Sequence, residues 1–454
     1  MDVKANVTSR LSGSVRVVAL GMLALGTLTT GCKEDDDPEG AAASTTYYAD
    51  VLPIFEKHCM GCHQSGGIGQ FSLADYSVAS SRAASIRAHT EARTMPPWLA
   101  TSDGSCGDFS NSLALSDEQI ATIARWAEEG AKAGTAREAK VPSLPSLAGA
   151  TKLKTPNFTP EIEGSAFAKY DEYRCFLFDA PREGFITGYN VVPGNENIVH
   201  HVLAMVVDGD AESELGDGTT NLEQLHALDD ASPDREGWSC FGMAGEGVSS
   251  GAIPVVWAPG QGVLDYPNQS GIPLKQSDKI IVQIHYNLAN PKNIGMSDQT
   301  EVQLRIEDDV PNVGVFVLAD PFLDSLFTEE PHTLKAGMDS VKYTWQHKLR
   351  DFGAQDGQEF DLYGVAPHMH EFGRKYQFSL GQGETANTCA TKIERWDFHW
   401  QRMYFFDEPY KLTAATPLKV TCDFNTSSVA EDILPGWGTQ NEMCLATLYL
   451  TVKR

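Results

Sequence analysis

The spacing of apolar residues changes part-way along the chain, and this change constrains the fold more than any other feature. After about residue 151 the sequence consists of short alternating runs bounded by Gly, Pro, Asn or Asp. A period of two is typical of half-buried β-strands, and short strands repeated in this way indicate a sandwich or a barrel. The clearest runs are Gly184 to Val191, His201 to Val207, Lys279 to Tyr286, Val302 to Ile306 and Leu445 to Val452.

The β region is too long for one sandwich of ordinary size. It holds roughly 300 residues, whereas a single sandwich of the immunoglobulin type needs about 100. We therefore predict two all-β, jelly-roll-like sandwich domains, at residues 151–310 and 311–454, which meet near residues 308–314.

The part of the chain before the β region is helical in character. Helices are predicted at residues 48–59, at 77–92 and from Ser116 onward, where Ser116 and Gln119 match a capping box. We predict a small all-α domain over residues 46–137, joined to the β region by a Pro-, Ser- and Ala-containing linker at 138–150. The chain is therefore expected to be a multidomain protein.

Residues 1–31 resemble an export signal. Lys4, Arg10 and Arg16 precede an apolar run at 17–28, which is shorter than the ~20 residues of a membrane span. The run ends in a sequence that resembles a bacterial lipobox, with Cys32 as the residue that would be acylated, followed by a tether at 32–45. We expect a lipid-anchored protein of the bacterial cell envelope, on the periplasmic side or in the outer membrane. Plain secretion is the alternative.

Charge and cysteine content support an exported protein that does not bind nucleic acid. The formal net charge of −26 would repel nucleic acid and anionic lipid surfaces. Nine cysteines are many for an oxidising compartment unless most are paired. Cys32 is assigned to lipid and two others to the motif described next, which leaves six for disulfides: Cys106, Cys175, Cys240, Cys389, Cys422 and Cys444.

The helical region contains a C-x-x-C-H motif formed by Cys59, Cys62 and His63. Two thiols at this spacing can add to the vinyl groups of haem, and the following His can bind the iron. The motif and its helical setting resemble the small class I cytochromes c, which implies one covalently bound haem c. A C-x-x-C disulfide beside an incidental His is the alternative.

A second axial ligand of the haem iron is expected downstream of the motif. We select Met95, because the prolines that follow it stiffen its loop and because a thioether ligand raises the haem potential. His89 is the rival, and an iron with an open position is a third possibility. Trp98 is expected to pack on the haem edge.

Five histidines form three clusters in the β region: His200 with His201, then His285, then His368 with His370. Residues two apart on a strand share a face, so His368 and His370 can bind one metal ion. Adjacent His200 and His201 point to opposite faces of a regular strand, so a shared ion requires a bulge there. Imidazoles without a carboxylate suit copper or zinc, and the thioether of Met443 favours copper.

The order His-His, Gln-x-His-Tyr, His-x-His and Glu-Met-Cys resembles the copper type II, ascorbate-dependent monooxygenases, from about Cys175 to the C-terminus. The resemblance implies two copper ions: one for electron transfer at His200, His201 and His285 in the first sandwich, and one for oxygen binding and catalysis at His368, His370 and Met443 in the second. It places Gln283 between the two sites. It also implies a Cys422–Cys444 disulfide and points to a Cys175–Cys240 pair, but it does not pair Cys106 or Cys389.

The sequence departs from the peptide-hydroxylating members of that family. Ala366, Leu445 and Thr447 stand where those enzymes carry polar substrate anchors, so we expect a small, less polar organic substrate. The implied reaction is C–H hydroxylation with O2. Electrons would come from an ascorbate-like reductant or a redox protein and pass through the tethered haem to the His200/His201/His285 copper. The alternatives are a copper-binding or redox-sensing lipoprotein and a haem electron carrier, both without oxygenase activity.

Overall fold

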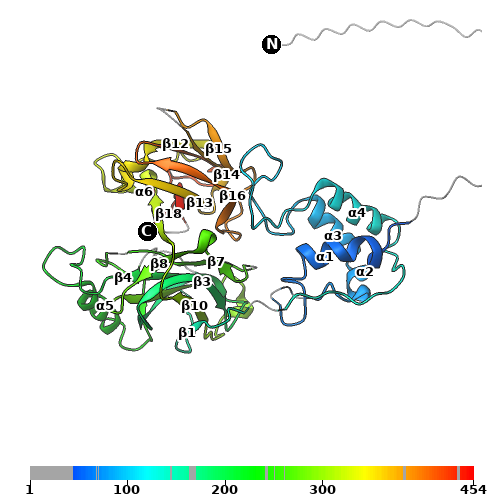
Figure 1. Ribbon diagram of the computed structural model, residues 1–454, viewed down its shortest axis with the longest axis horizontal. Coiled ribbons are helices and arrows are strands. Elements are labelled where there is room, and N and C mark those ends of the chain that lie inside the picture. Colours follow the sequence, from blue (N-terminus) through cyan, green and yellow to red (C-terminus); the bar gives the residue numbers. More distant parts are fainter. Residues whose placement is uncertain are drawn as a thin grey trace, which may run out of the picture. The chain divides into compact units, whose positions relative to one another are not determined.

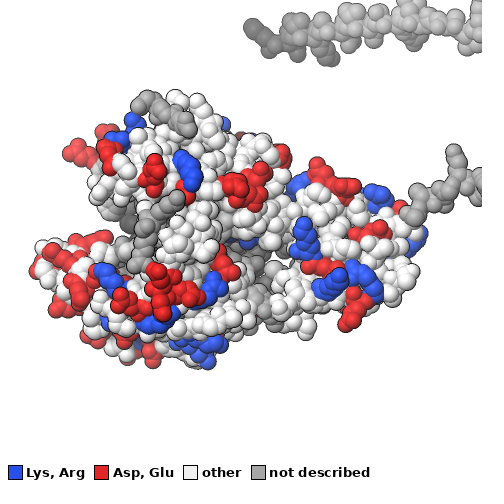
Figure 2. All heavy atoms as spheres, in the orientation of Figure 1, with Lys and Arg blue, Asp and Glu red and all other residues white. Residues whose placement is uncertain are grey.

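A computed structural model of the chain (Figure 1) describes residues 44–67, 69, 71–143, 146–162, 170–240, 244–249, 251–259, 261–381, 385–436 and 440–453. The predicted export signal and Cys32 lie outside these residues. Within the described part, no helix combines the length and the apolar character that a membrane crossing needs. Acidic side chains are spread over the surface of the domain that contains strands β3 (Gly184–Val192) and β10 (Glu301–Glu307) (Figure 2).

Short helices form the part of the chain that precedes the linker. They are η1 (Tyr47–Val51), α1 (Leu52–His58), α2 (Tyr76–Ser81), α3 (Ala83–Glu91) and α4 (Asp117–Glu128). The predicted capping box at the start of α4 is present, because the Ser116 side chain accepts from the Gln119 backbone and the Gln119 side chain accepts from Ser116. The helix predicted at 77–92 is interrupted at Arg82, whose φ and ψ are −110° and 5°. Aromatic rings of Tyr47, Phe55 and Trp126 form the core of this part.

The rest of the described chain is mainly β-structure, which confirms the predicted β domains. The strands are β1 (Thr151–Lys154), β2 (Asp171–Asp179), β3 (Gly184–Val192), β4 (Val199–Val207), β5 (Trp238–Ser239), β6 (Val255–Trp257), β7 (Leu264–Asp265), β8 (Ser270–Leu274), β9 (Lys279–Asn287), β10 (Glu301–Glu307), β11 (Asn312–Ala319), β12 (Val341–Lys348), β13 (Glu359–His368), β14 (Gly373–Leu380), β15 (Thr388–Ile393), β16 (Tyr404–Thr413), β17 (Pro417–Phe424) and β18 (Leu445–Lys453). Between them lie α5 (Asn221–Asp230), α6 (Pro321–Asp324), η2 (Pro267–Gln269), η3 (Pro291–Asn293), η4 (Ser325–Phe327) and η5 (Leu349–Phe352).

The strands form three sheets, two of which pack on the longest one to give separate cores. The longest sheet has nine strands in the order β1-β10-β3-β8-β11-β18-β13-β16, with β7 beside β3. The five-stranded sheet β5-β2-β9-β4-β6 belongs to the first β domain, and the four-stranded sheet β12-β17-β14-β15 belongs to the second. Each domain buries its own apolar cluster between its sheets.

The two β domains share one sheet, a feature that the sequence did not predict. Strand β8 of the first domain pairs in parallel with β11 of the second, with Ser270 opposite Asn312. Beside this pairing the hydroxyl groups of Ser270 and Tyr449 are hydrogen-bonded at 2.6 Å. Backbone hydrogen bonds therefore cross the domain boundary, and they restrict motion between the two halves.

Three disulfides reinforce the β domains. Cys175–Cys240 and Cys422–Cys444 are the pairs that the family resemblance pointed to. The third pair, Cys106–Cys389, joins the loop between α3 and α4 to strand β15. This resolves the two cysteines that the sequence left unassigned.

The loop between α3 and α4 packs on the second β domain, and this changes the role expected for Trp98. Its indole is buried in the core of that domain, in edge-to-face contact with the rings of Tyr404 at 4.9 Å and Phe109 at 5.7 Å. Bridges from Ala100 to Ile393 and from Phe109 to Phe406 hold the loop on the domain. A large aromatic side chain gains most by entering an extensive apolar core, so Trp98 is part of the β core.

Candidate metal centres

His200, His201 and His285 converge on one point in the first β domain. The Nδ1 atom of His200 lies 3.3 Å from Nδ1 of His201 and 3.1 Å from Nδ1 of His285, and the third Nδ1 pair is 3.1 Å apart. His285 is fully buried and the other two are partly buried. Three ring nitrogens facing one another in this way form a candidate metal site.

A bulge in strand β4 brings the adjacent pair His200 and His201 to the same point. Strands β4 and β9 are antiparallel, with His201 opposite His285, and the register shifts between Val199 and His201. The shift gives one strand an extra residue and turns its side chain out of the normal alternation. It is the irregularity that two adjacent ligands require.

Burial keeps the imidazoles of His200 and His201 neutral. It lowers the pKa of His200 to about 3, and the neighbouring His285 adds to the effect. The pKa of His201 also falls well below its usual value, mainly through burial. A neutral ring offers a lone pair to a metal ion, because proton and metal compete for the same nitrogen.

Asp171 and Tyr173 of strand β2 hold the ring of His285. The carboxylate of Asp171 lies 2.9 Å from Nε2 of His285, and it also accepts a hydrogen bond of 2.8 Å from Asn287. The ring of Tyr173 stacks on the imidazole at 4.1 Å and 7°. Burial alone would raise the pKa of Asp171, but the contacts with His285 and Asn287 bring it below its usual value. Hydrogen bonding at Nε2 leaves Nδ1 available for the metal.

Replacing Asp171 with Ala is expected to weaken copper binding at this cluster by about 10- to 100-fold, the usual effect of losing a partner that orients a ligand. Competition with a chelator of known affinity measures the change. Asp179→Ala is the matched control, because Asp179 lies on the same strand but pairs with Lys279 at the surface. Equal copper affinity in the two variants would show that Asp171 does not orient His285.

A second group of candidate ligands forms where strands β13 and β18 run side by side. His368 pairs with Leu445 in the antiparallel ladder, and His370 and Met443 lie just beyond this end of the two strands. The rings of His368 and His370 are 5.0 Å apart at 89°. His370 and Met443 are buried. The predicted ligand set therefore comes together at one end of the shared sheet.

Hydrogen bonds at Nδ1 orient both imidazoles of the second group. The Nδ1 atom of His370 lies 3.1 Å from the backbone oxygen of Asn441, and that of His368 is in close contact with Oε1 of Gln401. Both rings are therefore oriented through Nδ1, the reverse of the arrangement at His285, whose Nε2 contacts Asp171. Burial lowers the pKa of His368, while the Gln401 contact raises it slightly.

Glu442 links the two segments that carry the second group. Its carboxylate accepts hydrogen bonds from the backbone N–H of His370 at 2.9 Å, Phe372 at 2.7 Å and Met443 at 3.3 Å. The side chain is fully buried, and burial raises its pKa to about 8 against the opposing effect of these donors. Glu442 therefore holds the His-x-His turn against the Met443 strand.

Phe398 lies between the two histidine groups. Its ring stacks on His200 at 5.5 Å and meets His370 edge-on at 5.9 Å. The neighbouring His399 contacts His200 at 5.4 Å and pairs with Asp397 at 3.1 Å. One side chain of the second domain thus contacts a candidate ligand from each group. Gln283 instead lies against the first disulfide, 3.6 Å from the sulfur of Cys240.

The C-x-x-C-H motif lies in a turn at the end of α1. Cys59 and Cys62 are outside the three disulfides, and burial raises the pKa of Cys59 to about 12. The buried Nδ1 atom of His63 has no hydrogen-bond partner among the described residues. Gly69 lets the following loop approach the ring, because a Cβ there would lie 2.5 Å from that Nδ1. Two thiols and a buried imidazole nitrogen without a partner form a donor set that suits a covalently bound haem.

The structure places the two alternative axial ligands differently. His89 is exposed and its Nδ1 is hydrogen-bonded to the Thr94 hydroxyl at 2.8 Å. Met95 is partly buried and lines a cavity of about 600 Å³ that also contacts Leu115 and Ile120 of the helical part. Met95 is therefore less exposed than His89, and its assignment as the second axial ligand stays a prediction.

Several residues of the candidate centres were missed from the sequence: Asp171, Tyr173, Phe398, Gln401 and Glu442. Four of them lie on strands or loops far along the chain from the histidines they contact. Only Glu442 stood beside a predicted ligand, next to Met443, and an acidic residue just before the apolar run of β18 was a usable signal.

Comparison with known proteins bears on the second β domain most directly. Residues 353–451 match the family model "Copper type II ascorbate-dependent monooxygenase, C-terminal domain". This segment includes His368, His370 and Met443. The half of the β region that holds the second group of ligands is therefore similar to the C-terminal domain of this family.

Two curated relatives are similar to about two thirds of the chain. The chain is 22% identical over 312 residues to tyramine beta-hydroxylase of Caenorhabditis briggsae, covering 65% of this chain. It is also 22% identical over 323 residues to dopamine beta-hydroxylase of Rattus norvegicus, covering 68% of this chain. In both cases the match covers 47% of the relative, so the chain spans about half the length of the curated relatives it matches.

The similarity to solved structures is weak. The major capsid protein P2 from bacteriophage PM2 matches over 67% of this chain and 98% of its own, at 9% identity. Its TM-score of 0.25 is too low to establish a common fold. The copper monooxygenase likeness therefore rests on sequence and on the arrangement of the ligands.

Proposed function

We propose that this chain is a copper-dependent monooxygenase that uses O2 to hydroxylate a C–H bond of a small organic substrate, with electrons supplied through a c-type haem on the same chain. The observation that carries the proposal is the pair of histidine groups on joined β domains. In the first group the His285 ring is oriented by a contact at Nε2, and in the second the His370 ring is oriented by a contact at Nδ1. The ring of Phe398 contacts both groups.

The residues fit copper better than a hard metal ion. The first group offers three imidazoles, and the second offers two imidazoles with the thioether of Met443, which lies just before β18. Such soft and borderline donors suit copper that alternates between its two oxidation states. When bound, two coppers would supply oxygen activation and hold one electron each, while the protein excludes water and orients the substrate. The name "hydroxylase" of both curated relatives supports this class of reaction.

The proposed substrate is weakly polar, because the strands beside His368 offer few charged anchors. Ala366 is buried two residues before His368 on β13, and the residues of β18 that pair with Ala366 and His368 are Thr447 and Leu445. A substrate recognised here would be held mainly by apolar contact. Export and lipid anchoring through Cys32 belong to the same proposal, and labelling with a radioactive fatty acid in a bacterial host tests them.

Metal analysis together with oxygen consumption tests the proposed function. We expect two coppers and one haem iron per chain, and O2 uptake with a reductant and a suitable substrate that stops when the coppers are removed. Two coppers without O2 uptake across a broad set of apolar substrates would favour a copper-binding or redox-sensing protein. One iron without copper would leave a haem electron carrier.

Stopped-flow reduction separately tests whether the haem supplies the electrons. If the coppers are reduced only by added small reductants while the haem stays reduced, the haem is not the donor. Cys59→Ala with Cys62→Ala provides the matched protein without covalent haem.

A further inference from the structure

The guanidinium of Arg402 is a cation for which the described part of the chain provides no anion. Within the described residues it makes no hydrogen bond and no ion pair, and its Nε atom is completely enclosed. It lies over the indole of Trp98 at 5.0 Å. Burial lowers the pKa of Arg402, although Tyr404 and Cys62 oppose this. A partly buried arginine normally pairs with a carboxylate or a phosphate, because removing its charge from water is costly.

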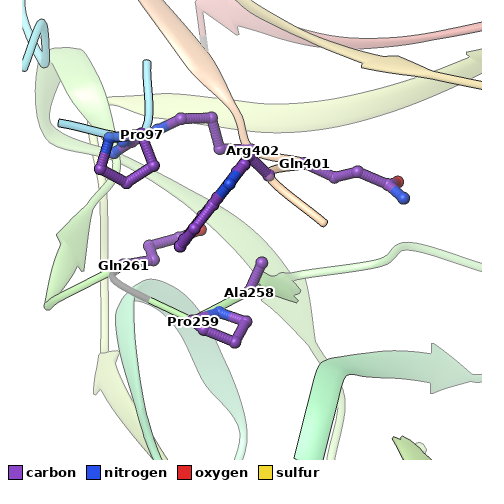
Figure 3. Close-up of a pocket in the computed structure, with 7 residues that line it drawn as sticks. Pro97, Ala258, Pro259, Gln261, Gln401 and Arg402 are labelled. Atoms are coloured by element: carbon purple, nitrogen blue, oxygen red, sulfur yellow. The ribbon is translucent and has the colours of Figure 1, made fainter. Parts of the chain in front are cut away.

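Arg402 extends away from the second histidine group. Figure 3 shows the Arg402 side chain running toward Pro97 while the side chain of its neighbour Gln401 runs in the opposite direction. Gln401 is the residue that contacts Nδ1 of His368. The Arg402 charge is therefore turned toward the loop that begins at Met95. This direction disfavours a role in holding a substrate at His368.

The guanidinium lies beside the segment that carries the predicted axial ligand Met95. It stands over the indole of Trp98, three residues after Met95, and Pro97 lines the same pocket as Arg402. In the haem-binding motif and the residue after it, Nδ1 of His63 and Nε2 of Gln64 are buried and have no hydrogen-bond partner among the described residues. In the β domains, Gln261 lines the pocket beside Arg402, and its buried Oε1 atom also has no hydrogen-bond partner among the described residues. Polar groups that lack partners thus occur on both sides of the boundary between the helical part and the β domains.

We propose that Arg402 of the second β domain belongs to the haem site, where its guanidinium pairs with a carboxylate of the haem attached at Cys59 and Cys62. The inference rests on the proposed haem. It adds to the haem site a residue of the second β domain, outside the helical part that carries the C-x-x-C-H motif. Haem carries carboxylate side chains, so it supplies the anion that Arg402 lacks. A positive charge near the iron also favours the reduced haem, which carries one positive charge less.

Pairing of Arg402 with the haem would also connect the haem site to the second group of ligands, because Arg402 and Gln401 are neighbours in the chain. Arg402 would bind the haem while Gln401 binds His368, and both belong to the segment that carries Phe398. The position of the haem would then be set by the β domain that holds the second group of ligands, and not by the helical part alone.

The haem reduction potential of the full, metal-loaded chain tests the inference. A unit charge about 10 Å from a redox centre, at an effective dielectric constant of about 20, changes the reduction equilibrium roughly tenfold, which is about 59 mV for a one-electron couple. We expect Arg402→Met to lower the potential by about this amount, measured by spectroelectrochemical titration of the haem bands. Arg402→Lys, which keeps the charge, should retain most of the wild-type potential.

Arg350→Met is the matched control, because it removes the same charge from an exposed ion pair with Asp356. An unchanged potential in Arg402→Met would overturn the inference and leave the proposed haem intact. A changed KM for substrate with an unchanged potential would assign Arg402 to substrate binding instead, which also overturns it. Loss of haem in Arg402→Met with recovery in Arg402→Lys supports the charge pairing, whereas loss in both variants shows a packing role only. A wild-type chain without haem would refute the proposed haem itself.

Discussion

A chain carrying His285→Ala is expected to bind one copper ion fewer than the wild type and to lose more than about 100-fold of its hydroxylation rate. The substitution removes the only fully buried ring of the three-histidine cluster. It also leaves Asp171 without the imidazole that it orients, so two weakly held ligands remain. Loss of a metal ligand should therefore lower copper affinity and activity by more than the roughly 10- to 100-fold that follows the loss of an orienting partner.

Copper content by mass spectrometry and the copper EPR signal measure this loss. The remaining copper should show the signal of the His368, His370 and Met443 group alone. His226→Ala is the matched control, because His226 is an exposed residue of α5 and should leave both coppers bound. Two coppers in the His285→Ala protein would show that His285 is not a ligand.

Replacing Glu442 with Ala is expected to destabilise the second β domain by on the order of 3–5 kcal/mol and to release its copper. The carboxylate accepts three backbone N–H groups, and each buried donor left without a partner costs about 1–3 kcal/mol. The same contacts hold His370 against Met443, so loss of the copper–sulfur bond should accompany the loss of stability. Glu442→Gln keeps one acceptor oxygen and should show a smaller effect on both.

Thermal unfolding and X-ray absorption at the copper edge measure the two effects separately. The exposed Glu431 lies on the segment leading to the same strand, so Glu431→Ala controls for loss of charge. If Glu442→Ala keeps both the melting temperature and the copper–sulfur signal of the wild type, the carboxylate does not position the ligands.

The candidate ligands could be found from the sequence because each cluster is local. His368 and His370 share a strand face through a spacing of two, and the adjacent pair His200 and His201 required the bulge that the structure contains. The same local reasoning identified the helix cap at Ser116 and the spacing of Cys59, Cys62 and His63.

The partners of these ligands could not be found in this way. Asp171 reaches His285 because β2 pairs with β9, and Gln401 reaches His368 from the segment that leads into β16, the strand paired with β13. Which strands pair, and in which register, depends on packing energies summed over whole sheets. A short stretch of sequence is therefore not enough to predict which strands pair.

The sequence by itself determined the types of element, the two β domains, the candidate ligands and the chemistry that those ligands suit. These depend on side-chain spacing and on the donor atoms that each residue carries, and both can be read from neighbouring residues. Only the tertiary structure decided that one sheet runs through both domains, that the loop containing Trp98 and Cys106 packs on the second domain, and that the Arg402 side chain runs toward Pro97. Such contacts join residues that are distant in the chain, so they are set by the packing of the folded protein as a whole.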